Sequence, residues 1–421
     1  MKRHGIGVFL FRAAKSFGNG LFLSKIRRHI ARLSVVSAVE GLLVRLFCPV
    51  NHKRVVFATF AGGCACNPKA VARALAVRRP DVEIVWLLDY FAYTSRKGVP
   101  DTGRAVQKST WKAFKAIATS AVMVENAQVF VGVGKPAKRA GQLYVNTWHG
   151  SLGIKRLDTA CEAVLKNARR RAKAIDVLLT NSTFEEEVFR TSLFPDVPLA
   201  RTGHPRNDVF FASDQSKSEI RKSVFDRLGL QADAKMALFA PTFRENAFAE
   251  GGEGYDFKAW AAALSDRFGG SWSVAVRLHP HDAKALAEGL IKLPEDVLDV
   301  SAFEDIQELL VAADAGITDY SSWIFDFLLG GRPGFIYAPD KAKYDESRGF
   351  YYPLEETPFP VSTDQAGLCA AIRAFDAEAF ARDRKRFLAA RGCMEDGRAA
   401  ERTVDLIVAH LDRLCGKGGA T

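Results

Sequence analysis

The sequence has no uninterrupted apolar run of the roughly 20 residues that a membrane-spanning helix needs. The longest candidate, residues 33–50, is interrupted by Glu40 and Arg45. At the N-terminus, Arg12 and Lys15 cut the apolar run short of a secretory signal. We therefore expect a protein that stays in the cytoplasm, at most as a peripheral protein on the inner face of the cell membrane.

Signatures of several common enzyme classes are also missing. The chain has no GxxxxGK(S/T) phosphate loop, which argues against an ATPase or kinase, and it has neither a GxSxG elbow nor an HExxH helix. It has no Asp-x-Asp clamp, so no metal site and no cofactor are expected. Seven cysteines without paired spacing do not make a zinc site, and we expect reduced, structural thiols.

The positive charge of the chain is concentrated at its N-terminus. Residues 1–54 carry eleven Lys and Arg side chains against the single acid Glu40, whereas the remainder has 48 basic and 47 acidic residues. Apolar runs such as 8–11 and 42–47 lie between these cations. Such a mixture suits the membrane interface, where each cation near anionic lipid adds about 1 kcal/mol. We expect an anionic membrane surface as partner and no nucleic acid; the alternative is that these residues form helices packed on the body.

After the basic segment, short apolar runs alternate with helical stretches in two series, as expected for a chain of 421 residues with two domains. Such alternation predicts parallel sheets covered on both faces, and hence an α/β protein with two doubly wound domains facing a cleft. A linker-like stretch separates the series at about residues 203–218. The predicted strands are 54–60, 82–88, 121–124, 129–133, 143–146 and 177–180, and then 236–240, 273–278, 297–300, 315–318 and 334–337.

Unusual polar residues follow the ends of predicted strands six times. In open α/β sheets, ligands bind beyond the carboxyl ends of the strands. Six such coincidences therefore indicate one ligand site between the two domains. The six segments are 147–150, 181–183, 203–208, 241–244, 279–281 and 319–322.

Three of these segments suggest chemistry. His149 follows a predicted strand, and its imidazole titrates near neutral pH, so it is our candidate base; the alternative is a structural histidine. Asp319 to Ser322 precede a predicted helix at 323–329, whose first amides could bind a phosphate or simply be capped. Arg277 and His279 could supply positive charge to a diphosphate.

The motifs taken in order resemble the CDP-glycerol glycerophosphotransferase family, which includes the teichoic acid primases and polymerases. The resemblance covers about residues 54–410 and depends on order and spacing more than on any one motif. The segments that carry it are Asn67-Pro68-Lys69-Ala70, Asn146 to Gly150, Gly203 to Asp208, Ala240 to Arg244, Arg277 to Pro280, Thr318 to Ser322 with Phe325-Asp326, Arg348 to Tyr351 with Glu355-Glu356, and Asp396-Gly397 to Arg402.

The resemblance implies a GT-B-like fold with two Rossmann-like domains. The expected division is a basic, amphipathic membrane-associating segment (1–53), an acceptor-binding domain (54–205), a CDP-polyol-binding domain (206–395) and a C-terminal helix (396–421). His149 and His279 are then the catalytic residues. The implied substrate-binding residues are Arg206, Asn207, Thr242, Arg244, Arg277, Asp319, Ser321, Ser322, Glu355 and Glu356, and the acceptor-side residues are Asn67, Trp148, Gly150 and Lys155.

The predicted function is transfer of a polyol phosphate from CDP-glycerol or CDP-ribitol to a hydroxyl of a lipid-linked or polymeric cell-surface glycan, with release of CMP. One alternative is a nucleotide-sugar glycosyltransferase or epimerase on the same scaffold. Another is a non-catalytic, membrane-bound scaffold for glycan assembly. The sequence leaves open which polyol is transferred, whether the acceptor belongs to wall polymer, capsule or lipopolysaccharide, and whether the chain forms a homo-oligomer.

Overall fold

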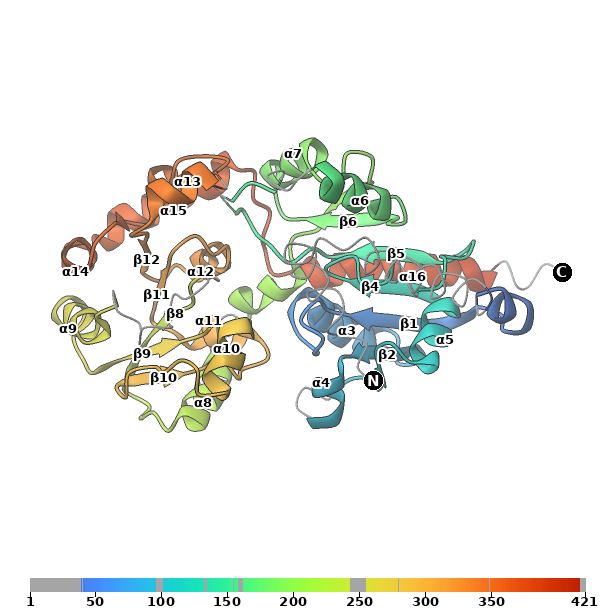
Figure 1. Ribbon diagram of the computed structural model, residues 1–421, viewed down its shortest axis with the longest axis horizontal. Coiled ribbons are helices and arrows are strands. Elements are labelled where there is room, and N and C mark those ends of the chain that lie inside the picture. Colours follow the sequence, from blue (N-terminus) through green and yellow to red (C-terminus); the bar gives the residue numbers. More distant parts are fainter. Residues whose placement is uncertain are drawn as a thin grey trace, which may run out of the picture.

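The computed structural model describes residues 39, 41–95, 101–131, 135–153, 155–157, 162–242, 255–278, 280–347 and 349–416. These residues form two lobes, each built around a parallel sheet (Figure 1). Most of the predicted basic segment lies outside the described residues, as do two predicted site residues, Arg244 and His279.

The N-terminal lobe contains a seven-stranded parallel sheet in the order β3-β2-β1-β4-β5-β6-β7. Val55 and Phe57 of β1 pack on one face of the sheet, and Val56 and Ala58 pack on the other. All four are completely buried, which explains the continuous apolar run of this segment. The strands are β1 (Asn51–Ala58), β2 (Glu83–Leu88), β3 (Arg104–Gln107), β4 (Ser120–Glu125), β5 (Leu143–Asn146), β6 (Val177–Thr180) and β7 (Leu199–Arg201); the helices are α3 (Cys66–Arg78), α4 (Tyr90–Ser95), α5 (Trp111–Ala118), α6 (Glu162–Ala172) and α7 (Thr183–Thr191).

The C-terminal lobe repeats this plan with six parallel strands in the order β10-β9-β8-β11-β12-β13. In both sheets the strand order reverses next to the first strand, between β1 and β4 and between β8 and β11, which is where doubly wound sheets bind ligands. The strands are β8 (Lys235–Phe239), β9 (Trp272–Val276), β10 (Val297–Asp299), β11 (Ala315–Thr318), β12 (Gly334–Tyr337) and β13 (Val361–Ser362); the helices are α8 (Asp214–Leu228), α9 (Phe257–Phe268), α10 (Pro280–Ala287), α11 (Ile306–Ala312), α12 (Trp323–Leu329), α13 (Lys341–Ser347), α14 (Gln365–Arg373) and α15 (Ala377–Ala390), with a 3-10 turn η2 (Leu354–Glu356).

The C-terminal helix α16 (Ala399–Gly416) returns to the N-terminal lobe (Figure 1). Val404, Ile407 and Leu411 are buried in the same core as Val55 of β1. The chain therefore crosses between the lobes twice, once through the 3-10 helix η1 (Pro205–Phe211) and once through the segment before α16.

The predicted α/β class with two doubly wound sheets is confirmed. The predicted strand at 129–133 is wrong over residues 129–131, which form a turn. The buried Glu125 carboxylate accepts a hydrogen bond from the Val129 amide, and this turns the chain away from the sheet. Three short strands, β3, β7 and β13, were not predicted, and the linker-like stretch contains η1 and the first turn of α8.

Candidate active site

A groove of about 910 Å³ lies between the lobes, at the carboxyl edges of both sheets. His149, beyond β5, and Phe60, beyond β1, line it from the N-terminal lobe. Arg277 follows β9, and Ser321 and Ser322 follow β11 on the opposite side. Arg206 lines the groove as well, so the structure brings together five of the predicted site residues from segments far apart in sequence.

The imidazole of His149 is held in one tautomer. Its Nδ1 lies 2.6 Å from the carbonyl oxygen of Asn126. Because a carbonyl can only accept, Nδ1 carries the proton and Nε2 keeps the lone pair that a general base needs. The rings of Phe60 and Trp148 lie beside it, with centroids 5.0 and 4.7 Å away. Burial of the imidazole lowers the pKa of His149 to about 4, so it is neutral at physiological pH.

The turn that carries His149 is fixed by residues predicted on the acceptor side. Trp148 has a left-handed backbone with φ +55°, an unfavourable conformation for an aromatic residue. Asn67, completely buried on α3, donates from Nδ2 to the carbonyls of Thr147 and Trp148, at 2.8 and 3.1 Å. A Cβ on Gly150 would lie only 2.7 Å from the indole nitrogen of Trp148. Asn67 and Gly150 thus shape the turn.

Arg206, predicted to bind substrate, is a buried connection between the lobes. Its Nε donates to Asp326 of α12 at 2.8 Å, and Nη2 donates to the carbonyl of Gly150 at 2.7 Å. The side chains of Arg206 and Asp326 are only 5% and 3% exposed. Asn207 donates to the same Asp326 carboxylate at 3.0 Å and is completely buried. Arg206 therefore joins the His149 turn to the first turn of α12, and Asn207 adds a second hydrogen bond to the Asp326 carboxylate.

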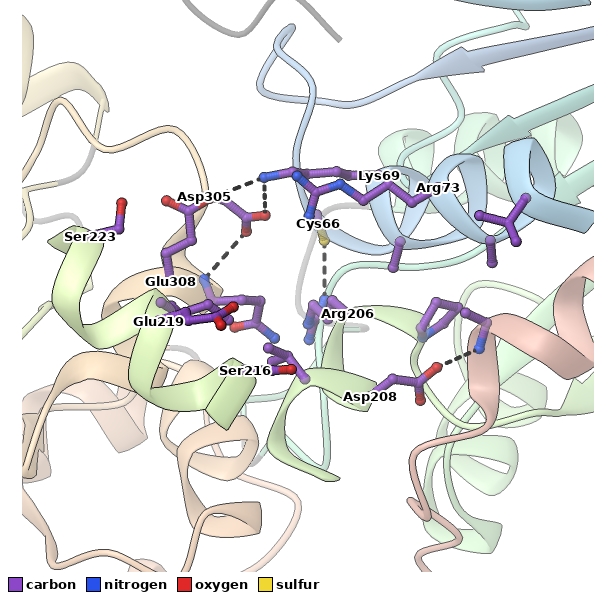
Figure 2. A pocket seen from close by; sticks show the side chains of 18 residues that line it. Cys66, Lys69, Arg73, Arg206, Asp208, Ser216, Glu219, Ser223, Asp305 and Glu308 are labelled. Carbon is purple, nitrogen blue, oxygen red and sulfur yellow. Dashed lines mark hydrogen bonds and ion pairs between the residues drawn. The ribbon is translucent and has the colours of Figure 1, made fainter. Parts of the chain in front are cut away.

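A second contact between the lobes involves residues that line another cavity, of about 750 Å³, next to the groove (Figure 2). Figure 2 shows Lys69 of α3 extended toward Asp305 and Arg206 facing Cys66. The ammonium of Lys69 lies 3.0 Å from Asp305 and 3.2 Å from Glu308, both in the C-terminal lobe. Asp305, Cys66 and Arg206 line this cavity and the groove alike, so they form the wall between them.

Asp319 and Thr242 bind each other at the edge of the C-terminal sheet. The Asp319 carboxylate, which is 2% exposed, accepts hydrogen bonds from the amide and hydroxyl of Thr242 at 2.9 Å. Lys155 of the N-terminal lobe lies 3.4 Å from the Thr242 hydroxyl. The pair joins the ends of β8 and β11 beneath Ser321 and does not line the groove itself.

Arg277, Ser321 and Ser322 do line the groove. Arg277 is anchored by a 2.9 Å hydrogen bond from Nη2 to the carbonyl of Phe303, and burial lowers its pKa. Ser322 occupies the N-cap position of α12, but its side chain makes no capping hydrogen bond. A guanidinium facing two hydroxyl-bearing residues can bind the phosphates of an anionic ligand.

Glu355 and Glu356 lie apart from the groove. They form η2 on the C-terminal lobe, where Glu355 pairs with Lys341 at 2.6 Å and Glu356 with Arg391 at 3.1 Å. Both line a separate cavity of about 340 Å³. Their geometry supports a structural role for this pair.

Sequence reasoning missed Asn126 and Phe60, both of which contact His149. Asn126 is completely buried; besides its carbonyl bond to His149, its Oδ1 accepts the amide of Phe60 at 2.9 Å. It follows β4 directly, so the strand-end rule applied to other segments would have found it. Phe60 was assigned to the first strand, because an aromatic residue after an apolar run carries no sign of a strand end.

Comparisons with known proteins agree with this geometry. The family model described as CDP-glycerol:poly(glycerophosphate) glycerophosphotransferase matches residues 42–409. The teichoic acid poly(glycerol phosphate) polymerase of Bacillus spizizenii is 29% identical, over 79% of this chain and 85% of its own length. The teichoic acid glycerol-phosphate transferase of Staphylococcus aureus is 27% identical, over 85% of this chain and 93% of its own. The chain spans only 42% of the Bacillus subtilis polymerase, with which it shares 30% identity.

A solved structure of the wall teichoic acid polymerase TagF superimposes on this fold with a TM-score of 0.76 and 26% identity, covering 95% of this chain and all of the other. A histidine variant of the same polymerase soaked with CDPG gives a TM-score of 0.76 and 26% identity, over 93% and 98% of the two chains. The similarity therefore extends over both lobes and the groove between them.

Proposed function

The chain belongs to the CDP-glycerol:poly(glycerophosphate) glycerophosphotransferase family, and we propose that His149 is the base of its reaction. The protein is an enzyme that transfers a polyol phosphate from a CDP-polyol to a glycan; the nucleotide-sugar and non-catalytic alternatives are not favoured. We propose CDP-glycerol as the donor, bound in the groove, and a teichoic acid-like polymer as the acceptor. The observation that supports this best is the shared groove of His149, Arg277 and Ser321.

The proposed step is one displacement at phosphorus. An acceptor hydroxyl gives its proton to Nε2 of His149 and attacks the phosphorus that bears glycerol. A bond forms between the acceptor oxygen and that phosphorus, the bond to the bridging oxygen breaks, and CMP leaves with both electrons. Arg277 and the hydroxyls of Ser321 and Ser322 stabilise the charge on the diphosphate and on CMP. Catalysis then depends mainly on positioning and preorganised charge.

The test is to incubate the protein with labelled CDP-glycerol, CDP-ribitol and a UDP-sugar, each with a short polyol-phosphate acceptor. We expect CMP release and a lengthened acceptor with CDP-glycerol. We also propose that no metal or cofactor is needed, so EDTA should leave the rate unchanged. Release of a nucleoside diphosphate from the UDP-sugar, with no CMP from either CDP-polyol, would contradict the proposal.

We further propose that the enzyme lies on the inner face of the cell membrane. Residues 41–47 are helical and expose Leu42, Leu46 and Phe47, which are 57%, 67% and 76% exposed. Within the described part of the chain, no helix has the length and apolarity to cross a bilayer. Apolar side chains beside the cation Arg45 suit insertion at the lipid interface.

Vesicle flotation tests the membrane proposal. Full-length protein should float with phosphatidylglycerol vesicles and remain behind with phosphatidylcholine vesicles at low salt. Changing both Leu46 and Phe47 to serine should reduce flotation by about tenfold, since two exposed apolar side chains lose their insertion energy. A matched change at an exposed apolar position elsewhere, Leu290→Ser, should have no effect. Equal flotation of all three proteins would refute the assignment of this surface.

A further inference from the structure

A smaller cavity of about 230 Å³ lies against the other side of the His149 turn. His149 and Ser322 line both this cavity and the larger groove. The remaining walls come from Trp148, from residues 150–153, 155 and 157, from α7 and from Tyr351 of the C-terminal lobe. The base therefore stands where two cavities meet, one large enough for a nucleotide and one with room for a single small unit.

The walls of the small cavity combine aromatic and aliphatic side chains with a few polar ones. Trp148, Phe184, Phe189 and Tyr351 line it, and Trp148 packs edge-on against Phe189 with ring centroids 5.2 Å apart. Lys155 also lines it and contributes a cation, and the one carboxylate of the lining, Glu185, lies 3.0 Å from the imidazole of His204. Aromatic faces contact the C–H groups of a polyol or sugar, and an ammonium attracts a phosphate. The lining suits an anionic, polyhydroxylated ligand.

Three hydrogen bonds between the lobes, each with at least one main-chain group, hold this cavity in shape. The amide of Arg156 donates to the carbonyl of Gly349 at 3.2 Å, and the amide of Leu157 donates to the Tyr351 hydroxyl at 3.0 Å. The hydroxyl of Tyr352 donates to the carbonyl of Leu152 at 2.6 Å. Segment 349–352 thereby fixes the chain that follows His149, so the cavity keeps a constant position relative to the base.

We propose that this cavity binds the terminal polyol-phosphate unit of the acceptor, an inference that rests on the proposed function. The free hydroxyl of the unit points to His149, its carbon chain lies on Trp148 and Tyr351, and its phosphate lies near Lys155. In-line displacement requires the attacking oxygen and the departing CMP to lie on opposite sides of the phosphorus. Two cavities that meet at His149 and Ser322 provide such an arrangement, with the donor in the groove and the acceptor in the smaller cavity.

The first test fills the cavity. Leu157→Trp adds an indole at its wall and should lower kcat/KM for the acceptor by about 100-fold, because the hydroxyl can no longer reach its position. The affinity for CDP-glycerol, measured by calorimetry, should stay within about twofold, since the donor groove does not include Leu157. A matched control, Leu406→Trp on the exposed face of α16, should transfer at the wild-type rate.

A second, milder variant tests the same assignment in case Leu157→Trp does not fold. Lys155→Gln removes the charge but keeps a hydrogen-bond donor for the Thr242 hydroxyl, and it should raise the acceptor KM by about tenfold with a smaller effect on kcat, because a charge-assisted contact to phosphate is lost. If Leu157→Trp and Lys155→Gln both show the wild-type acceptor KM, the assignment of this cavity is wrong. Wild-type protein that binds no CDP-glycerol and releases no CMP would instead overturn the proposed function, and this assignment with it.

Discussion

Changing His149 to asparagine is expected to lower kcat about a thousandfold while CDP-glycerol still binds. General base catalysis contributes about 10²–10⁴ to enzymatic rates, and His149 is the one base proposed here for the acceptor hydroxyl. The asparagine amide can still donate to the carbonyl of Asn126, so the turn should keep its shape. Single-turnover CMP release measures the loss, and calorimetry with CDP-glycerol shows that the site is intact. The matched control is His52→Asn, at an exposed position in β1.

The pH profile of the wild-type enzyme gives an independent readout of the same residue. The base must be neutral, so kcat/KM should fall as the pH drops through the pKa of His149 in the free enzyme, about 4. At pH 5.5 an ordinary imidazole with a pKa of about 6.5 would already be about nine-tenths protonated, whereas His149 should remain neutral. Nearly equal kcat/KM at pH 7 and 5.5 is therefore expected. A tenfold fall over this interval would contradict the role of burial at His149.

Protein stability must be followed in the same pH series. The unfolded chain binds the His149 proton at a pKa of about 6.5 and the folded protein at about 4. The unfolded state thus takes up more protons between these values, and the contribution of His149 to stability is lost as the pH falls through this window. A return to full activity after readjustment to pH 7 separates reversible protonation of the base from unfolding.

Changing Arg206 to methionine is expected to lower the free energy of unfolding by about 3–5 kcal/mol, because the Asp326 carboxylate is left buried without its cation. Chemical denaturation followed by circular dichroism measures the change. Transfer activity should fall as well, since Arg206 also bonds to the carbonyl of Gly150 next to His149. The double variant Arg206→Met/Asp326→Leu should regain part of the stability, as a buried ion pair can be replaced by apolar groups of similar size.

An exposed ion pair provides the control for this experiment. Arg398, just before α16, and Glu401, in its first turn, are 65% and 57% exposed, and such pairs contribute at most about 1 kcal/mol. Arg398→Met should therefore change stability little. If Arg206→Met proves as mild as Arg398→Met, the Arg206–Asp326 pair is not the interlobe connection described above.

The site residues fall into two groups once their contacts are known. His149, Arg277, Ser321 and Ser322 line the groove, and Trp148 and Lys155 line the smaller cavity. Other residues of the same motifs position these side chains through hydrogen bonds: the buried Asn67 holds the Trp148 turn, the buried Asn207 bonds to Asp326, and Thr242 pairs with the buried Asp319. In this chain the motifs combine reacting groups with the hydrogen bonds that position them.

The sequence by itself was sufficient for the fold class, since a buried parallel strand has to be apolar on both faces and so appears as a short continuous run. It was also sufficient to predict that His149 and Ser321 face the same groove, because the carboxyl ends of parallel strands lie at one edge of a sheet. Short edge strands such as β13 could not be predicted, because a strand of two residues shows no hydrophobic periodicity.

Only the tertiary structure decided which polar side chains face the ligand and which face the protein. Arg206 and Arg277 look alike in sequence and both line the groove, but the Arg206 guanidinium is neutralised by the buried Asp326 carboxylate, whereas Arg277 is anchored by the carbonyl oxygen of Phe303. The same holds for the C-terminal helix, whose apolar stripe at Val404, Ile407 and Leu411 completes the core of the distant N-terminal lobe. The physical reason is common to these cases. The environment of a side chain is determined by residues that are remote in sequence, and the local sequence does not show which residues these are.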